Sequence, residues 1–259
     1  PEHRDRTLKI GTFSAASNVT GILANPDELA RVMHAHGGYA FFDYAAAAPY
    51  VDIDMHPDPD DECRKDAVFL SVHKFIGGPQ TPGVLAANKD LFLTDVPAEP
   101  GGGTVLYTSP WAYKYLEDVE HREEGGTPPI VQVIRAGLVF DLKEMIGTER
   151  IEAVEHHFVR RAIAAWADDD RIRILGDLDA PRIGIVSVIL DGGKLHHNLA
   201  VRMLNDLYGI QVRGGCMCAG TYGHDLLGIS QEQSETIRCS LDDGYVAAKP
   251  GWVRCSFSP

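Results

Sequence analysis

Short apolar runs that alternate with a helix-forming segment constrain the fold of this chain more than any other feature. Residues 8–13 and 39–42 each form an apolar run typical of a strand. A helix is expected between them, because Asn25 can cap it, Pro26 suits its first turn and Glu28 occupies the capping-box position. Further strand-like runs lie at 67–72 and 83–87. Repeated strand–helix–strand units favour a mostly parallel sheet with helices on its faces, so the sequence predicts an α/β fold.

The second half has a different pattern. Helices are expected at 130–145 and 148–166, separated by Gly147, and at 195–208. Strand-like runs follow at 171–175, 184–190, 210–213 and 252–257. This order is typical of an α+β unit. We therefore predict a large-domain segment over 1–147 and a smaller α+β domain over 148–259.

Composition excludes several classes of function. The 259 residues are 44% hydrophobic, enough for a sizeable core, and carry a formal net charge of −13. An acidic chain lacks the basic surface that nucleic-acid binding needs, so no nucleic-acid partner is expected. No apolar run approaches the roughly 20 residues that cross a bilayer, so no membrane partner is expected either. The five cysteines form no even framework, and we expect reduced thiols in the cytoplasm.

The segment from Ser71 to Pro79, SVHKFIGGP, is the most informative one for function. An expected strand delivers Lys74 into a glycine-rich turn, and open α/β sheets bind ligands just beyond their strand ends. A lysine there can attack a carbonyl carbon to form a Schiff base. The simpler interpretation is a surface lysine before a tight turn. Asp43 also follows a strand, where an acid commonly caps a helix or lies in a solvated turn.

The lysine segment resembles the cofactor-lysine motif Ser-x-His-Lys-x-x-Gly-Pro of the class V aminotransferase family, with one extra glycine. The likeness extends upstream to Phe42-Asp43-Tyr44-Ala45, at the spacing of that family. It implies the fold type I architecture and pyridoxal 5′-phosphate (PLP) as cofactor, carried by Lys74. It also implies that Asp43 faces the pyridine nitrogen and keeps it protonated, which makes the ring an electron sink.

Other cofactor contacts are implied by the same resemblance. The run from Ser17 to Gly21, SNVTG, is similar to a loop whose asparagine, here Asn18, approaches the phenolic oxygen of the cofactor. Ser71 and His73 would donate hydrogen bonds to its phosphate. The step around Thr127 resembles the segment by which a partner subunit covers that phosphate, which implies a homodimer.

A second motif resembles the cysteine desulfurases and selenocysteine lyases. The run from Val212 to Ala219, VRGGCMCA, is similar to their Val-Arg-x-Gly-His-His-Cys-Ala, and counting from Arg213 places Cys218 at the nucleophile. A thiolate can accept sulfur as a persulfide. The resemblance further implies that Arg254 clamps the carboxylate of a small amino-acid substrate, cysteine, through its bidentate fork, with Arg213 as the supporting cation. A sulfur-acceptor protein would be a further partner.

The residues themselves leave alternatives open for Cys216 and Cys218. They could be buried apolar thiols, a common state of free cysteine. They could bind metal together with His224, although two cysteines one residue apart make a weak zinc signature, and we assign no metal site. They could also form a redox pair.

Two departures from the family pattern affect the functional prediction. Ala46 stands where the family has a glutamine that contacts the phenolic oxygen, and Cys216 and Met217 replace two histidines. Family members also continue beyond both ends of this sequence, so we expect a fragment that lacks the N-terminal part of the site. Three hypotheses result: a cysteine desulfurase, another class V enzyme such as an aminotransferase or β-lyase, and a non-enzymatic scaffold.

Overall fold

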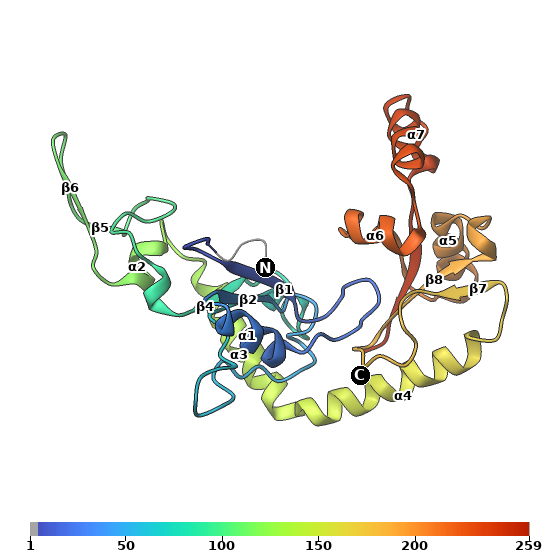
Figure 1. Ribbon diagram of the computed structural model, residues 1–259, viewed down its shortest axis with the longest axis horizontal. Helices are drawn as coiled ribbons and strands as arrows, with labels where there is room; N and C mark the ends of the chain where they lie inside the picture. The colour runs from blue at the N-terminus through green and yellow to red at the C-terminus, as the bar shows by residue number, and fades with distance from the viewer. Residues whose placement is uncertain (1–4, 259) are drawn as a thin grey trace. The chain divides into compact units, whose positions relative to one another are not determined.

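The computed structural model describes residues 5–258. The chain divides into two compact units, one made of Pro1–Ala15 with Asn25–Ile146 and the other of Ala16–Ala24 with Gly147–Pro259 (Figure 1). The segment Ala16–Ala24 therefore leaves the first unit, packs in the second, and returns. Nothing in the sequence pattern predicted this exchange.

The first unit contains a four-stranded sheet in the order β1-β2-β3-β4. Strand β1 (Ile10–Ser14) pairs in parallel with β2 (Tyr39–Asp43), and β2 pairs in parallel with β3 (Ala67–Leu70). Strand β4 (Val84–Ala87) is antiparallel to β3. The predicted mostly parallel α/β sheet is confirmed, with β4 as the antiparallel exception. The connection from β3 to β4, residues 71–83, contains the 3₁₀ turn Val72–Lys74 but no crossover α-helix, and β4 returns antiparallel to β3.

Helix α1 (Pro26–Ala35) makes the crossover between β1 and β2. It begins where the sequence predicts, because the Asn25 side chain accepts a hydrogen bond from the Glu28 backbone N–H and Pro26 occupies the first turn. Gly37 ends the helix region with a φ of +65°, a conformation that suits glycine.

The rest of the first unit connects and covers this sheet. Helix α3 (Ile130–Ile146) was predicted, whereas α2 (Val119–Glu123) and the hairpin of β5 (Val105–Thr108) and β6 (Tyr113–Tyr115) were not. Two short 3₁₀ turns span Val72–Lys74 and Lys89–Leu91. The hairpin projects from its unit in Figure 1, and the Trp111 side chain near its tip is 91% exposed.

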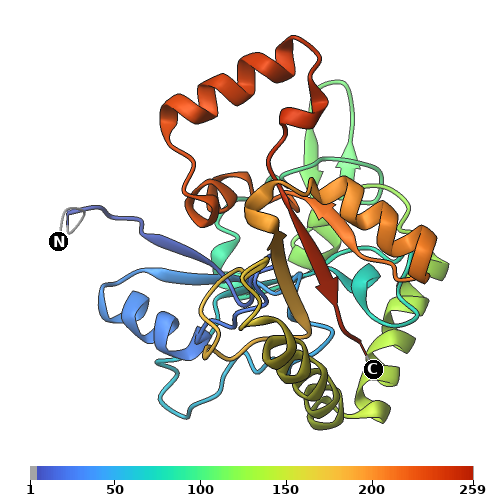
Figure 2. The ribbon, with the colours of Figure 1, turned by 90° about the vertical axis from the view of Figure 1, so that its right-hand side faces the viewer.

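The second unit is built on an antiparallel sheet in the order β7-β8-β10-β9. Its strands are β7 (Ile172–Ile174), β8 (Ile185–Leu190), β9 (Arg213–Gly215) and β10 (Trp252–Ser256). Figure 2 shows β8 and β10 side by side in this sheet. Its helices are α4 (Thr148–Trp166), α5 (His197–Tyr208), α6 (Gly220–Leu227) and α7 (Gln231–Asp242), and 3₁₀ turns span Asp191–Gly193 and Val246–Ala248.

The two faces of this second sheet bury different clusters. Val186, Val188 and Val253 pack with residues of α4 and α5 on one face. On the other face, Trp252 and Ile189 pack with Val19, Leu175 and Met217. Val19 belongs to the inserted segment Ala16–Ala24, so this segment completes the second core.

Two details of the second unit differ from the sequence prediction. Strand β9 begins at Arg213, later than predicted, and helices α6 and α7 had not been anticipated. Within residues 5–258, no helix has the length and apolar character needed to cross a membrane.

Candidate functional site

In the first unit, Asp43 lies at the carboxyl end of the parallel strands. It is the last residue of β2 and is level with Ser14 of β1 and Phe69 of β3. Its Oδ1 accepts a hydrogen bond of 2.7 Å from the Ala45 backbone N–H, so the carboxylate is held in one orientation by an Asx turn. The turn leaves the second carboxylate oxygen available. Burial, and then the charge of Asp27, raise the pKa of the next residue, Tyr44, so its phenol stays neutral.

Asp43 and Ser71 line one hollow at this strand end. The hollow measures about 520 Å³ and is also lined by Thr12, Ser14 and Ala45. A volume of that size suits a small organic ligand, since such sites span roughly 300–1,000 Å³. A carboxylate and a hydroxyl at the same opening match a ligand that has both a protonated ring nitrogen and a phosphate.

Lys74 follows Ser71 on a turn that is firmly anchored. Val72 and Phe75 on either side are 0% and 5% exposed, whereas Lys74 projects into solvent. The Lys74 backbone N–H donates to Ser71 O at 3.0 Å, and Phe75 N–H donates to Val72 O at 3.0 Å. The structure thus replaces the predicted end of the strand by a 3₁₀ turn, which presents His73 and Lys74 as exposed side chains.

Gly78 makes this turn possible. A Cβ atom at Gly78 would lie 2.1 Å from Val72 O, which no side chain tolerates. The Gly78 carbonyl also accepts a hydrogen bond of 2.7 Å from the buried Thr81 hydroxyl. The glycine of the motif is therefore required by close backbone approach.

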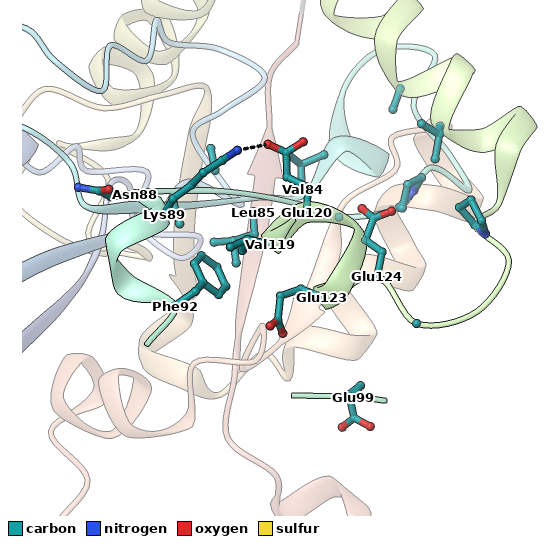
Figure 3. Close-up of a pocket in the computed structure, with 18 of the residues that line it drawn as sticks. Val84, Leu85, Asn88, Lys89, Phe92, Glu99, Val119, Glu120, Glu123 and Glu124 are labelled. Atoms are coloured by element: carbon teal, nitrogen blue, oxygen red, sulfur yellow. Dashed lines mark ion pairs between the residues drawn. The ribbon is translucent and has the colours of Figure 1, made fainter. Parts of the chain in front are cut away.

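Thr127 is not brought to the hollow of Asp43 and Ser71. It lines a separate groove of about 1,170 Å³ in the first unit, shown in Figure 3. Lys89 and Glu120 form an ion pair of 3.1 Å beside it, and Glu123 and Glu124 add negative charge. The Glu120 carboxylate raises the pKa of Lys89. Arg64 and Lys65 also line this groove, so its charges are mixed, and Thr127 is not among the residues that line the hollow of Asp43 and Ser71.

In the second unit, Arg213 and Arg254 face each other across β9 and β10. The two residues are directly opposite each other in the antiparallel pair, so their side chains lie on the same face of the sheet. Like charges at such a position repel, and an arrangement of this kind is stable with an anion between or beside them. The Arg254 guanidinium donates a hydrogen bond of 3.0 Å to the Asn18 carbonyl.

Hydrogen bonds hold the segment that carries Asn18 against the same face of the sheet. Ser187, level with Arg254 in the neighbouring strand, donates from its hydroxyl to Val19 O at 2.5 Å. The Ser17 hydroxyl accepts the Val19 and Thr20 backbone N–H groups at 3.1 Å each. These bonds fix the backbone on either side of Asn18, whose amide Nδ2 donates to Met217 O at 2.6 Å.

Cys216, Met217 and Cys218 form a tight reverse turn that ends at Ala219. Ala219 N–H donates to Cys216 O at 3.0 Å, and the two central residues, Met217 and Cys218, have φ values of 55° and 61°. Positive φ at both central positions defines a type I′ turn, which normally takes Gly, Asn or Asp. The strained turn persists because Met217 is 3% exposed in the core and its carbonyl is held by Asn18.

The turn separates the two cysteines by environment. Cys218 is exposed, whereas Cys216 is half-buried against the cluster of Trp252 and Met217. The exposed thiol is the one that a substrate or a partner protein can reach. An inert buried thiol is therefore excluded for Cys218 but not for Cys216.

The metal alternative for these cysteines finds no ligand set in the described chain. His224 uses both ring nitrogens in hydrogen bonds, to Gly220 O at 2.8 Å and to the Ser234 hydroxyl at 2.9 Å. Residues 5–258 contain no group of three or more His, Cys, Asp and Glu side chains placed to hold a metal ion.

Sequence reasoning missed two residues that position the candidate site. Ser187 holds the Asn18 segment and Met217 supplies the carbonyl that Asn18 binds. Ser187 carries a weak signal, since it is a polar residue at an inward position of the apolar run 184–190. Met217 carries none, because the hydrogen bond uses its backbone.

The chain matches known proteins over most of its length. Residues 1–245 match the family model described as Aminotransferase class-V. A probable cysteine desulfurase of Halalkalibacterium halodurans is 31% identical over 215 residues, 82% of this chain and 49% of that protein. A cysteine desulfurase of Haloferax volcanii is 29% identical over 226 residues, 87% and 50% of the two chains.

Solved structures give the same result. The apo structure of a cysteine desulfurase from Thermococcus onnurineus NA1 superposes with a TM-score of 0.76 at 29% identity, covering 96% of this chain and 55% of that one. The chain thus spans about half the length of the relatives it matches.

Proposed function

Because the chain belongs to the class V aminotransferase family, we propose that it forms part of a PLP-dependent cysteine desulfurase, which converts L-cysteine to alanine and an enzyme persulfide. The observation that carries this proposal is the exposed Cys218 on a strained turn whose central carbonyl is held by Asn18. Strain of this kind is retained where a side chain must be presented for function.

The first unit supplies the cofactor residues in this proposal, as the C-terminal part of a cofactor-binding large domain over 1–147. PLP bound here acts as an electron sink for the substrate carbon. Asp43 and Ser71, which line one hollow, would face the ring nitrogen and the phosphate of the cofactor, and His73 would be a second donor to the phosphate. Lys74 would hold the cofactor through its amine and would move the substrate proton.

The second unit supplies the substrate and acceptor residues, as the small domain over 148–259 together with the inserted segment. Arg254, supported by Arg213, binds the substrate carboxylate. Asn18 uses one amide hydrogen for Met217 O and would have its second amide hydrogen for the phenolic oxygen of the cofactor. The Cys218 thiolate attacks the sulfur of L-cysteine, the bond from that sulfur to carbon breaks, and alanine leaves after protonation.

The proposal includes two protein partners. A second copy of the chain would bring its Thr127 segment to the phosphate, consistent with the position of Thr127 outside the hollow of Asp43 and Ser71. The exposed Trp111 on the β5-β6 hairpin supports a homodimer, since large aromatic side chains are enriched at interfaces. A sulfur-acceptor protein would then take the sulfur from Cys218, in the reducing cytoplasm where the five free cysteines remain thiols.

A second candidate function is another class V reaction, such as transamination or β-elimination, with Cys218 as a bystander. Ala46 in place of the usual glutamine, and Cys216 and Met217 in place of two histidines, favour it. Alanine and sulfide as products support the desulfurase, whereas a keto acid as product supports the alternative.

Borohydride reduction tests the cofactor assignment that both candidates share. The full-length protein is incubated with PLP, reduced, digested and mapped by mass spectrometry. The pyridoxyl label is expected on Lys74 and absent from Lys89, an exposed lysine of the same unit. Labelling of Lys89 in place of Lys74 contradicts the assignment, and a protein with no visible absorbance after PLP addition favours the non-enzymatic scaffold.

A further inference from the structure

Cys216 and Cys218 are the first and third residues of one reverse turn. The bond from Ala219 N–H to Cys216 O closes the turn, and Met217 between them has a left-handed helical φ of 55°. Helical geometry places alternate Cα atoms about 5.4 Å apart, from the radius, rise and rotation of the helix. Disulfides need Cα atoms about 4.4–6.8 Å apart, so the backbone already has a separation that permits a bond between these two cysteines.

We propose that Cys216 is a resolving thiol that releases the sulfur bound to Cys218. The persulfide on Cys218 comes from the desulfurase reaction, and to this extent the inference rests on the proposed function. The Cys216 thiolate attacks Sγ of Cys218, a Cys216–Cys218 disulfide forms, and the bond from Sγ to the outer sulfur breaks. The outer sulfur leaves as hydrosulfide and takes the electron pair of that bond, so the two cysteines are oxidised while the transferred sulfur is reduced.

Among the described cysteines, Cys216 alone shares the turn with Cys218. Cys239 lies on α7, and Cys63 belongs to the other compact unit. Cys255 is paired with Val186 on β10, so it lies on the sheet face opposite to Arg254, Trp252 and the turn. Burial also raises the pKa of the Cys255 thiol, which disfavours its thiolate.

The turn lowers the conformational cost of this step. Positive φ is unfavourable at Met217 and Cys218, and the folded protein maintains it through the buried Met217 side chain and the Asn18 bond. The chain around the two thiols is therefore bent before the reaction begins. A disulfide across a single residue is strained, so a small dithiol reductant can reopen it and restore both thiols.

Release of the sulfur by Cys216 makes further turnover depend on a reductant. While the acceptor protein is absent, the sulfur leaves Cys218 as hydrosulfide and the enzyme rests as the disulfide. Each further cycle then requires a dithiol reductant, whereas a monothiol restores the pair more slowly. The persulfide is delivered intact only to a partner that reaches the exposed Cys218 before Cys216 does.

The test loads sulfur without the PLP reaction, so that it is independent of the proposed function. The full-length protein is treated with a small excess of inorganic polysulfide, quenched with an alkylating agent at intervals, and measured by intact mass and peptide mapping. The wild type is expected to lose two hydrogens and to show a linked peptide of Cys216 and Cys218. Cys216→Ser should instead retain one added sulfur on Cys218 for at least about tenfold longer.

Cys239→Ser is the matched control, since it removes an exposed cysteine elsewhere in the same unit and should behave as the wild type. Peptide mapping of the wild type requires no variant, so a folding defect in Cys216→Ser leaves the test intact. A wild-type persulfide on Cys218 as long-lived as that of Cys216→Ser, or a disulfide that includes Cys239, overturns the inference. If polysulfide gives the disulfide but L-cysteine with PLP yields neither persulfide nor disulfide, the resolving role stands and the desulfurase proposal fails.

Discussion

The Asn18 amide donates a 2.6 Å hydrogen bond to the carbonyl of Met217, a residue 199 positions later in the chain. The bond joins the inserted segment Ala16–Ala24 to the turn that presents Cys218. The Asn18 carbonyl in turn accepts a hydrogen bond from Arg254. One short segment thus connects the predicted carboxylate-binding arginine to the predicted sulfur acceptor within the second unit.

Asn18→Ala tests whether this bond positions Cys218. Its loss should destabilise the second unit by about 1 kcal/mol and relax the strained turn. Sulfide production should fall about tenfold or more, since small misplacements of reacting groups are costly. The alkylation rate of Cys218 should also change. Asn205→Ala, at an exposed position on α5, is the control; equal alkylation kinetics in the two variants would count against the positioning role.

Asp43→Asn separates charge from local geometry. Asparagine retains the oxygen that accepts the Ala45 N–H, so the Asx turn and the free energy of unfolding should be nearly unchanged. The negative charge toward the ring nitrogen is lost, and turnover should fall by about a hundredfold or more. The measurement is alanine production beside thermal unfolding. Wild-type turnover in this variant would mean that Asp43 has no electrostatic role.

Gly78→Ala tests the turn that presents Lys74. The added Cβ would clash with Val72 O, so the free energy of unfolding should decrease by more than about 2 kcal/mol and PLP binding should weaken. Gly137→Ala is the matched control, because Gly137 lies within α3 with open space around it. Alanine there should leave stability unchanged or raise it by about 0.5–1 kcal/mol. Similar unfolding curves for both variants would show that the close approach at Gly78 is not required.

The buried carboxyl of Glu155 should make the free energy of unfolding depend on pH. Its side chain is 1% exposed, and burial raises its pKa from 4.5 to about 7, with Glu152 adding to the rise and a hydrogen bond from Gly184 opposing it. The folded state therefore binds a proton that the unfolded state has released between these two values. As pH rises through this window, the free energy of unfolding should fall by about 2 kcal/mol after allowance for solvent screening. Above the window it should no longer change because of this group.

Glu155→Gln should remove this slope, because the amide does not titrate. Glu149→Gln changes an exposed position on the same helix and should retain it. Urea unfolding at about pH 5 and about pH 8 measures the difference. A wild-type stability that rises between these values relative to Glu155→Gln would contradict the buried, protonated carboxyl.

The sequence predicted local structure where local chemistry decides it. The Asn25 cap, the Pro26 first turn and the end of α5 at Tyr208 were confirmed because each rests on contacts within a few residues. The antiparallel β4 and the start of β9 at Arg213 differed from the prediction. Strand direction and register depend on pairing partners far away in sequence.

The sequence predicted which residues form the candidate site, but not the long-range hydrogen bonds that position them. Lys74 and Cys218 lie in recognisable motifs, whereas the bond from Asn18 to Met217 O and the docking of Val19 O on Ser187 join residues at least 168 positions apart. The positive φ values of Met217 and Cys218 could not be foreseen, since neither residue favours them. Tertiary contacts impose that turn on a sequence that would avoid it.

Locating the transferred sulfur tests the central proposal most directly. The full-length protein, loaded with PLP and given L-cysteine, is quenched by alkylation within the first turnover and mapped by mass spectrometry, with wild type, Cys218→Ser, Cys216→Ser and Cys239→Ser compared. Sulfur is expected on Cys218, most persistently in Cys216→Ser, and Cys218→Ser should bind PLP yet release almost no sulfide. Added sulfur on Cys216 alone, or undiminished alanine and sulfide from Cys218→Ser, would contradict the assignment of Cys218 as the acceptor.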